Sequence, residues 1–391
     1  MTLHLAVALD GHGWHPAAWR VAPADPAAIF TAGHWAGLVA EADAAELDFV
    51  TIDDTFGPPS DDPARVTGRL DAVLVAARVA PLTRHVGLVP VATTTHTEPF
   101  HLSTALATLD YVSRGRAGWQ VRVSARPEEA ELLGLRPPLP AAELFAEAAD
   151  AVEVVRRLWD SWQDDAVIKD VATGRFIDRE RLHYIDFAGE YFRVKGPSIV
   201  PRPPQGQPVI TALAHSPAAY EFAARSADVV FVTPADAADA SAIVARAGSA
   251  PVFADLLVFL DERAGSAIER RARLDELLTE PERSEPQRSE PGQSEPQQRE
   301  PQQREPWQSD AAVFAGGPEQ LADLLISWRA AGVDGVRLRP ATLPHDLTAI
   351  TRLLVPLLRK RGVFRPRLGS LRQRLGLPAA VNRYSEGASV G

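Results

Sequence analysis

The sequence predicts a (β/α)₈ TIM barrel, an α/β fold with insertions. Short β-rich runs alternate with longer runs of helical periodicity, which is the pattern of parallel strands joined by crossover helices. Eight such repeats fit in roughly 250 residues plus insertions, as a closed barrel requires. A doubly wound open sheet is the structural alternative, but the turn Asp10-Gly11-His12-Gly13-Trp14 lacks the G-x-G-x-x-G spacing of that fold.

The predicted strands are, in chain order, Leu3–Ala8, Phe49–Asp53, His85–Val91, Ala117–Val123, Val209–Ala214, Asp228–Val232, Val252–Leu260 and Gly335–Arg339. The helical stretches between them include Gly33–Leu47, Leu70–Val79, Ala141–Trp162, Pro217–Ala227, Pro318–Ala331 and Leu347–Arg361. In such a barrel the active site lies at the carboxyl ends of the strands, so the loops that follow strands carry the functional residues.

Composition narrows the class of partner. The chain has 391 residues, of which 46% are hydrophobic, and this is enough to bury a large core. Its net charge of −10 provides no basic field for nucleic acid or for an anionic membrane. There is no cysteine, which excludes disulfides and thiolate sites. No signal peptide and no apolar run of about 18 residues is apparent, so we expect a cytoplasmic protein.

Two stretches interrupt the repeat. Residues 1–280 hold seven strands with an insertion at about 164–208, and 311–391 hold the last β/α unit and the C-terminal tail of the same domain. The insertion, rich in Gly, Pro and aromatic residues, predicts a small hairpin or lid. Residues 281–310 form a pentapeptide repeat of Pro, Gln, Glu and Arg. With almost nothing apolar to bury, this repeat is expected to be a disordered linker between strands seven and eight.

Polar residues follow four of the predicted strands. Histidines 12 and 15 follow the first strand, where such a side chain could bind a ligand or move a proton, although a hydrogen-bonded loop histidine is an equal alternative. The second strand ends with Asp53-Asp54. Because neighbouring strand residues point to opposite faces, only one of these carboxylates can line the barrel mouth.

The third cluster, after strand three, contains Thr93-Thr94-Thr95-His96 with Glu98 and His101. Its hydroxyls could hold a ring or a phosphate, although threonine is also a routine strand residue. The fourth is His215-Ser216, directly before a helix, where the serine could cap the helix or bind a phosphate. The histidines lack metal-ligand spacing, so no metal site is predicted.

Longer motifs resemble one family. They are similar to blocks of the nitrilotriacetate, dibenzothiophene-sulfone and long-chain alkane monooxygenases, which are luciferase-like flavoproteins. The motifs are Thr108-Leu109-Asp110, Ser113-Arg114-Gly115-Arg116-Ala117-Gly118-Trp119, Leu158-Trp159-Asp160-Ser161-Trp162, Gly189-Glu190-Tyr191-Phe192-Arg193-Val194-Lys195-Gly196-Pro197, Gly317-Pro318, Val355-Pro356, Lys360-Arg361-Gly362 and Phe364-Arg365. The matches span nearly the whole chain except the pentapeptide repeat.

The resemblance implies an FMN-dependent monooxygenase. Reduced FMN, delivered by a separate flavin reductase, would activate molecular oxygen for transfer to a small organic substrate. Carried over by position, the catalytic residues would be His15 and Glu98, and the cofactor-binding residues would be Asp54, Thr95, Ser124, His215 and Ser216. Barrel relatives commonly pair through helices, so a homodimer is also expected.

Some family positions are altered. An Arg-Tyr pair that grips the flavin phosphate falls on Leu144-Phe145, a glycine falls on Ala214, and Val123 stands where a hydroxyl is expected. Each lost bond to a charged group is worth roughly 1.5–3 kcal/mol, so these changes predict weaker flavin binding. Two alternatives therefore stay open: a barrel that has become a non-catalytic binding protein, and an oxidoreductase that uses a deazaflavin.

Overall fold

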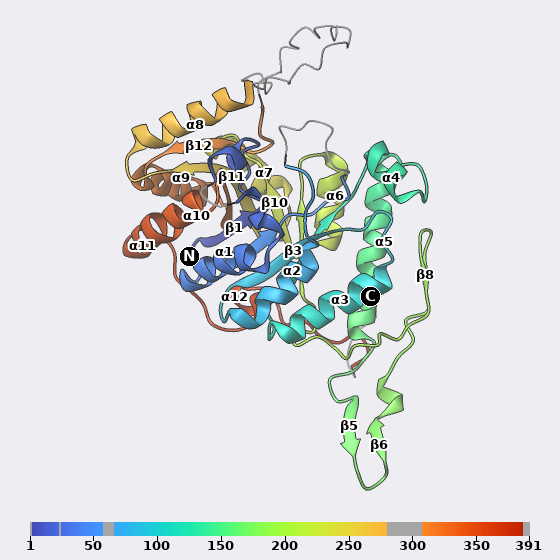
Figure 1. Ribbon diagram of the computed structural model, residues 1–391. Helices are drawn as coiled ribbons and strands as arrows, with labels where there is room; N and C mark the ends of the chain where they lie inside the picture. Colours follow the sequence, from blue (N-terminus) through green and yellow to red (C-terminus); the bar gives the residue numbers. More distant parts are fainter. Residues whose placement is uncertain (1, 23–24, 58–65, 280–306, 386–391) are drawn as a thin grey trace, which may run out of the picture.

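A closed parallel barrel forms the centre of the molecule (Figure 1). The computed structural model describes residues 2–22, 25–57, 66–279 and 307–385. The first barrel strand pairs with the second on one side and with the last on the other, and the sixth pairs with the seventh, which closes the ring. The predicted (β/α)₈ class is therefore confirmed, and the open sheet is excluded.

All eight predicted strands are present, with ends shifted by at most two residues. They are β1 (His4–Leu9), β2 (Phe49–Ile52), β3 (Gly87–Thr93), β4 (Gly118–Arg122), β9 (Val209–Leu213), β10 (Val229–Val232), β11 (Val252–Leu260) and β13 (Gly335–Pro340). They form because runs of Val, Ile, Leu and Phe can bury both faces, one inside the barrel and one under the helices.

A ninth parallel strand was not predicted. This strand, β12 (Val313–Gly316), pairs with the carboxyl half of β11, whose amino half pairs with β10. It is four residues long and only its last residue is fully buried. A segment so short and so little buried shows no recognisable strand pattern. It pairs with the part of β11 that extends beyond β10.

Helices surround the barrel. The main ones are α1 (Ala32–Ala44), α2 (Ala72–Val79), α3 (Pro99–Val112), α4 (Pro127–Leu133), α5 (Ala141–Asp160), α6 (Pro217–Ser226), α7 (Ala237–Arg246), α8 (Ala264–Thr279) and α9 (Pro318–Ala330). The predicted stretch Leu347–Arg361 is split into α10 (His345–Ala349), a π-helical turn (Ile350–Leu354) and α11 (Val355–Lys360), because Pro356 supplies no backbone N–H to the helical ladder. No helix in the described segments is long and apolar enough to cross a membrane.

The insertion at 164–208 consists of two small hairpins, β5 (Val167–Asp170) with β6 (Arg175–Ile177) and β7 (Phe187–Ala188) with β8 (Arg193–Val194). The segment leaves the end of α5 and precedes β9, so it starts and finishes at the amino-terminal end of the barrel (Figure 1). Trp162 and Gln163 tie its base to Ser198 and to the C-terminal tail at Tyr384. The hairpin prediction is correct, whereas the lid prediction is wrong, because a lid would require a loop that follows a strand.

A short helix, α12 (Leu371–Arg374), closes the amino-terminal end of the barrel. Its residue Leu371, together with Leu375, packs against the barrel-lining Phe49 and Phe253. A Cβ at Gly87 would lie 2.7 Å from a methyl group of Leu371, so only glycine lets β3 and this helix approach so closely. The C-terminal tail is therefore part of the barrel core.

A buried ion cluster fills the middle of the barrel. Asp255 on β11 is fully buried and accepts from Arg337 Nε at 2.7 Å and from Arg339 Nε at 3.0 Å, both on β13. The guanidinium carbon of Arg337 also lies 3.7 Å from the centroid of the Phe231 ring, and this side chain donates to Gln120 Oε1. The two arginines hold the pKa of Asp255 below its ordinary value despite the opposing effect of burial.

Replacement of Asp255 by Asn should lower the free energy of unfolding by about 3–5 kcal/mol, because buried Arg337 would lose its counter-ion and Arg339 would keep only its bond to Asp310. Urea unfolding curves measure this change. The matched control is Asp165→Asn, since Asp165 has a side chain 65% exposed and pairs with Arg181 at 3.5 Å; we expect a loss below about 1 kcal/mol. Equal losses in the two variants would contradict a dominant role for the buried cluster.

Candidate active site

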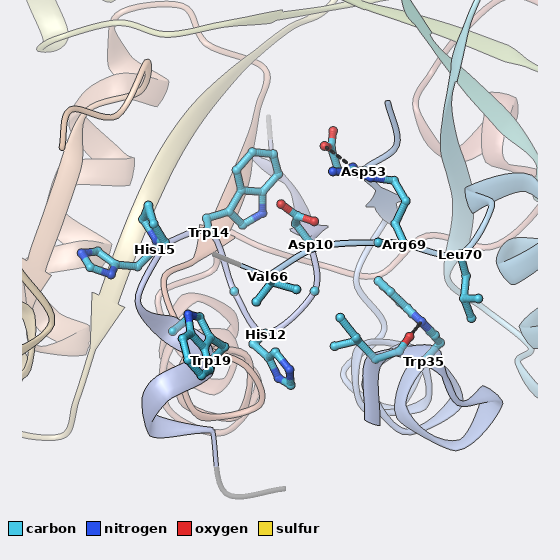
Figure 2. A pocket seen from close by; sticks show the side chains of 16 residues that line it. Asp10, His12, Trp14, His15, Trp19, Trp35, Asp53, Val66, Arg69 and Leu70 are labelled. Carbon is cyan, nitrogen blue, oxygen red and sulfur yellow. Dashed lines mark hydrogen bonds and ion pairs between the residues drawn. The ribbon is translucent and has the colours of Figure 1, made fainter. Parts of the chain in front are cut away.

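The carboxyl ends of the strands surround a cavity of about 230 Å³ beneath the loop that follows β1 (Figure 2). The loop reverses direction at Gly13, where a side chain would collide with the backbone of Ala341 at 2.3 Å. The lining residues come from the β1 loop, from α1 and the turn before it, and from the segment before α2. They are Asp10, Gly11, His12, Gly13, Trp14, His15, Pro16, Ala18, Trp19, Ile29, Trp35, Asp53, Val66, Gly68, Arg69 and Leu70.

Asp10 is the principal titratable group of this cavity. Figure 2 shows its carboxyl between Trp14 and Arg69, beside Asp53. Burial, followed by the negative charge of Asp53, raises the pKa of Asp10 to about 7, against the opposing effect of Arg69 and Arg122. Sequence reasoning missed this residue. The available signal was the two-residue period of β1, which places Asp10 on the same face as Ala6 and Ala8.

Asp53 rather than Asp54 lines the cavity. The carboxylate of Asp53 accepts from Arg122 Nη1 at 3.2 Å and lies 3.9 Å from Arg69 Nη1. The carboxylate of Asp54 accepts from the backbone N–H of Thr55 at 2.7 Å and of Ala72 at 2.9 Å. As expected, only one of the two neighbours faces the mouth; it is Asp53, whereas Asp54, the predicted cofactor ligand, fixes the start of α2.

His15 lies at the edge of the cavity with its ring turned away from it (Figure 2). Its Nδ1 accepts from Ala17 N at 3.2 Å, and its Nε2 lies 3.1 Å from a carboxylate oxygen of Asp275 on α8. The ring packs edge-on against Phe259 and Trp307. Burial lowers the pKa of His15. Both nitrogens are thus engaged: Nδ1 bonds within the β1 loop, and Nε2 holds this loop against α8.

The ends of β3 and β4 form a second polar group. Thr95 is fully buried, and its hydroxyl accepts from the backbone N–H of Ser124 at 3.0 Å. The Oγ of Ser124 and both ring nitrogens of His96 are buried without any hydrogen-bond partner. His96 also has φ of 64°, which is unfavourable for a residue other than glycine. The unfavourable backbone conformation of His96 thus occurs beside buried polar atoms that have no hydrogen-bond partner. Sequence alone could not distinguish His96 from its polar neighbours.

Glu98 lies at the start of α3, outside the first cavity. It is exposed, and its Oε1 accepts from Phe100 N at 3.4 Å as an N-cap. This capping bond satisfies one of the free backbone donors at the helix start. Glu98, predicted to be catalytic, therefore has a second possible role, which is to cap α3.

A third group surrounds the start of α6, where a groove of about 420 Å³ separates α6 from α7. Ser216 caps α6, with its Oγ accepting from Ala219 N at 3.4 Å, and the exposed His215 lies beside it. Tyr220 and Arg246 line the same groove, and the Arg246 guanidinium lies 5.7 Å from the Tyr220 ring centroid. The groove therefore combines a helix N-terminus, a hydroxyl and a cation.

The side of α6 that faces α5 is apolar. Leu144 is fully buried, and the ring of Phe145 lies 5.6 Å from that of Phe222. No arginine or tyrosine hydroxyl occupies these two positions, so a phosphate near Ser216 would find its cation on α7. Sequence reasoning missed Arg246, because its distance from Ser216 in the chain gives no sign that they share a groove.

Together, the three groups define a barrel enzyme with a polar mouth. One group is a carboxylate cavity, one is a set of unpartnered buried polar atoms, and one is a cationic groove at a helix start. Among the described residues, no group of three or more His, Asp or Glu side chains is arranged to hold a metal ion. The arrangement suits binding and orientation of a ligand with a ring and an anionic end.

Comparison with known proteins identifies the family. The family model described as luciferase-like monooxygenase matches residues 13–335. The chain is 31% identical to the N-acetyl-S-(2-succino)cysteine monooxygenase of Bacillus subtilis (strain 168), over 98% of both chains. It is 30% identical to nitrilotriacetate monooxygenase component A of Aminobacter aminovorans, over 96% of both.

A solved structure shares the fold. EDTA monooxygenase from Chelativorans sp. BNC1 superimposes with a TM-score of 0.80 at 24% identity, covering 97% of this chain and 99% of that one. The chain therefore belongs to the luciferase-like monooxygenase family, and the resemblance found in the sequence motifs is confirmed. The predicted enzyme class, a flavin-dependent monooxygenase, is confirmed at the level of the family.

The pH dependence of stability should reveal the raised pKa of Asp10. Its pKa is about 7 in the folded protein against an ordinary 3.8, so the folded state binds more protons than the unfolded state between these values. Stability should therefore fall as pH rises from about 4 to about 7, and this fall should be smaller in Asp10→Asn. Urea unfolding across that range tests it, with Asp165→Asn as the control that follows the wild type. Parallel curves for Asp10→Asn and wild type would refute the assignment.

Proposed function

We propose that this chain is the oxygenase component of a two-component monooxygenase. It would receive reduced FMN from a separate flavin reductase and use molecular oxygen to oxygenate a small organic substrate. Family membership supports the class of reaction. The observation that supports flavin binding in this chain is the set of buried, unpartnered polar atoms on Ser124 and His96 at the barrel mouth.

These atoms fit the polar edge of a flavin ring. Such an edge presents both hydrogen-bond donors and acceptors. A serine hydroxyl can donate and accept, and a neutral imidazole offers one of each. Burial lowers the pKa of His96, which favours its neutral form. Thr95 would help indirectly, because its hydroxyl holds the Ser124 backbone in place.

The groove at α6 would hold the phosphate of FMN. His215 and Ser216 are the predicted ligands, and Arg246 would supply the positive charge that Leu144 and Phe145 do not. A helix start with free backbone N–H groups favours an anion at this position. Arg246 on α7 would then replace the positive charge that is missing at the altered family positions.

When bound, the reduced flavin would activate molecular oxygen, and the chain would supply orientation and proton control. Asp10 is the group of the cavity whose pKa, about 7, lets it hold or release a proton near neutral pH. His15 would act on the site by fixing the β1 loop. Roles for Glu98 and Asp54 stay predictions, as do a homodimer and a cytoplasmic location.

The test is titration of the purified protein with FMN in oxidised and reduced forms, followed by oxygen uptake with a generic flavin reductase. We expect reduced FMN to bind at micromolar concentration or tighter, with oxygen uptake that depends on the chain. Binding of neither form would refute the proposal and support the non-catalytic alternative. Reduction of a deazaflavin without oxygen uptake would support the other alternative.

Ser124→Ala provides a test of the ring site within the same titration. Removal of an unpartnered hydroxyl should leave stability unchanged or raised, whereas affinity for reduced FMN should fall roughly fivefold, the equivalent of about 1 kcal/mol. The matched control is Ser103→Ala. Ser103 is also buried, but its hydroxyl donates to Phe100 O at 2.8 Å, so its loss should reduce stability and leave affinity unchanged.

The phosphate site is tested by comparison of FMN with riboflavin. Arg246→Met should weaken FMN binding by about tenfold or more, because a bond between charged groups is worth roughly 1.5–3 kcal/mol, and should leave riboflavin binding unaltered. Arg225→Met, on the exposed end of α6, is the control and should change neither. If Arg246→Met weakens both ligands equally, or neither, the phosphate lies elsewhere.

A further inference from the structure

Arg374 on α12 is a buried arginine with no hydrogen-bond partner. Its side chain lies at the amino-terminal end of the barrel, opposite the mouth, and the residue is 1% exposed. The Nε, Nη1 and Nη2 atoms all lack an acceptor. Burial lowers the pKa of Arg374 to about 10, which still leaves the group charged at neutral pH. A buried guanidinium group without an acceptor is unfavourable unless a ligand supplies one.

The carboxylates nearest to Arg374 already serve other donors. Asp43 accepts from three consecutive backbone N–H groups, of which His85 lies at 2.7 Å and Val86 at 2.8 Å. Asp48 accepts from Leu5 N at 2.9 Å and lies 3.2 Å from His4 Nδ1. Neither forms a direct bond to Arg374, although both lie close enough to affect its pKa.

The neighbouring arginines have hydrogen-bond acceptors, whereas Arg374 has none. Arg116 donates to the carbonyls of Ala80, Thr83, Val86 and Ser113. Arg367 donates to the Arg374 carbonyl at 3.1 Å and to Thr2 Oγ1 at 2.9 Å. Within this region, His85 Nε2 is a second buried atom without a partner, and the charge of Arg374 affects the pKa of His85.

The unpartnered atoms in this region favour an anion. Asp43 and Asp48, which act on the pKa of Arg374, already accept from other donors, and Glu46 is paired with Arg359 at 3.1 Å. The unpartnered atoms of Arg374 are all donors, and His85 Nε2 can donate in one tautomer, so the ligand must accept hydrogen bonds.

We propose that the amino-terminal end of the barrel contains a structural binding site for a small monovalent anion such as chloride. Arg374 and His85 would hold this anion. A halide suits a buried site because it accepts from several donors at once and needs little space. Since Arg374 belongs to the helix that closes the barrel, the anion would fasten the C-terminal tail to the segment before β3.

Diffraction from wild-type crystals soaked in bromide tests the site directly. We expect an anomalous peak within hydrogen-bond distance of the Arg374 guanidinium. A water molecule there, or no peak, would overturn the proposal. This measurement needs no variant and no flavin, so its outcome is independent of the proposed monooxygenase activity.

Thermal unfolding tests the consequence for stability. In sodium chloride the wild-type protein should unfold about 2 °C or more above its midpoint in sodium gluconate of equal ionic strength, since only the small anion fits. Arg374→Met should lose this difference, and the exposed Arg352→Met should keep it. Equal midpoints of the wild type in both salts would contradict an anion site.

Discussion

The pairing of Asp255 with Arg337 and Arg339 is the interaction on which the barrel depends. A barrel interior is usually filled by branched apolar side chains, whereas here one carboxylate and two guanidinium groups occupy its middle. Each member is tolerable only because the others are present. Since Asp255 and its partners lie on adjacent strands, the cluster also fixes the register of β11 against β13, and with it the position of the loops above.

The two ends of the barrel differ in how their polar groups are satisfied. At the mouth, Asp53 and Arg122 are paired, while Ser124 and His96 keep buried atoms free of partners. At the opposite end Arg116 is satisfied by backbone carbonyls, whereas Arg374 and His85 Nε2 have no partner. Unpartnered buried polar atoms are uncommon in stable proteins, so their occurrence at both ends points to two ligands, an organic one at the mouth and an anion at the closed end.

Much of the fold follows from local pattern. The eight barrel strands are runs of buried apolar residues with recognisable ends, and period alone placed them to within two residues. β12 was not predicted because only its last residue is fully buried, and α12 was not predicted because four residues make barely one helical turn. The predicted lid failed for a different reason: composition indicated hairpins in the insertion, but which end of the barrel they occupy depends on the order of helix and strand around them.

The sequence by itself determined the barrel, its family and the loops where chemistry is expected, because hydrophobic period and motif spacing are properties of neighbouring residues. Tertiary structure decided which polar side chains are available. His15 and Asp54 look functional in sequence, yet their polar atoms already hold backbone or side-chain partners. Asp10, His96 and Arg246 gain their importance only from burial, strain and a shared groove, which arise when distant segments pack together.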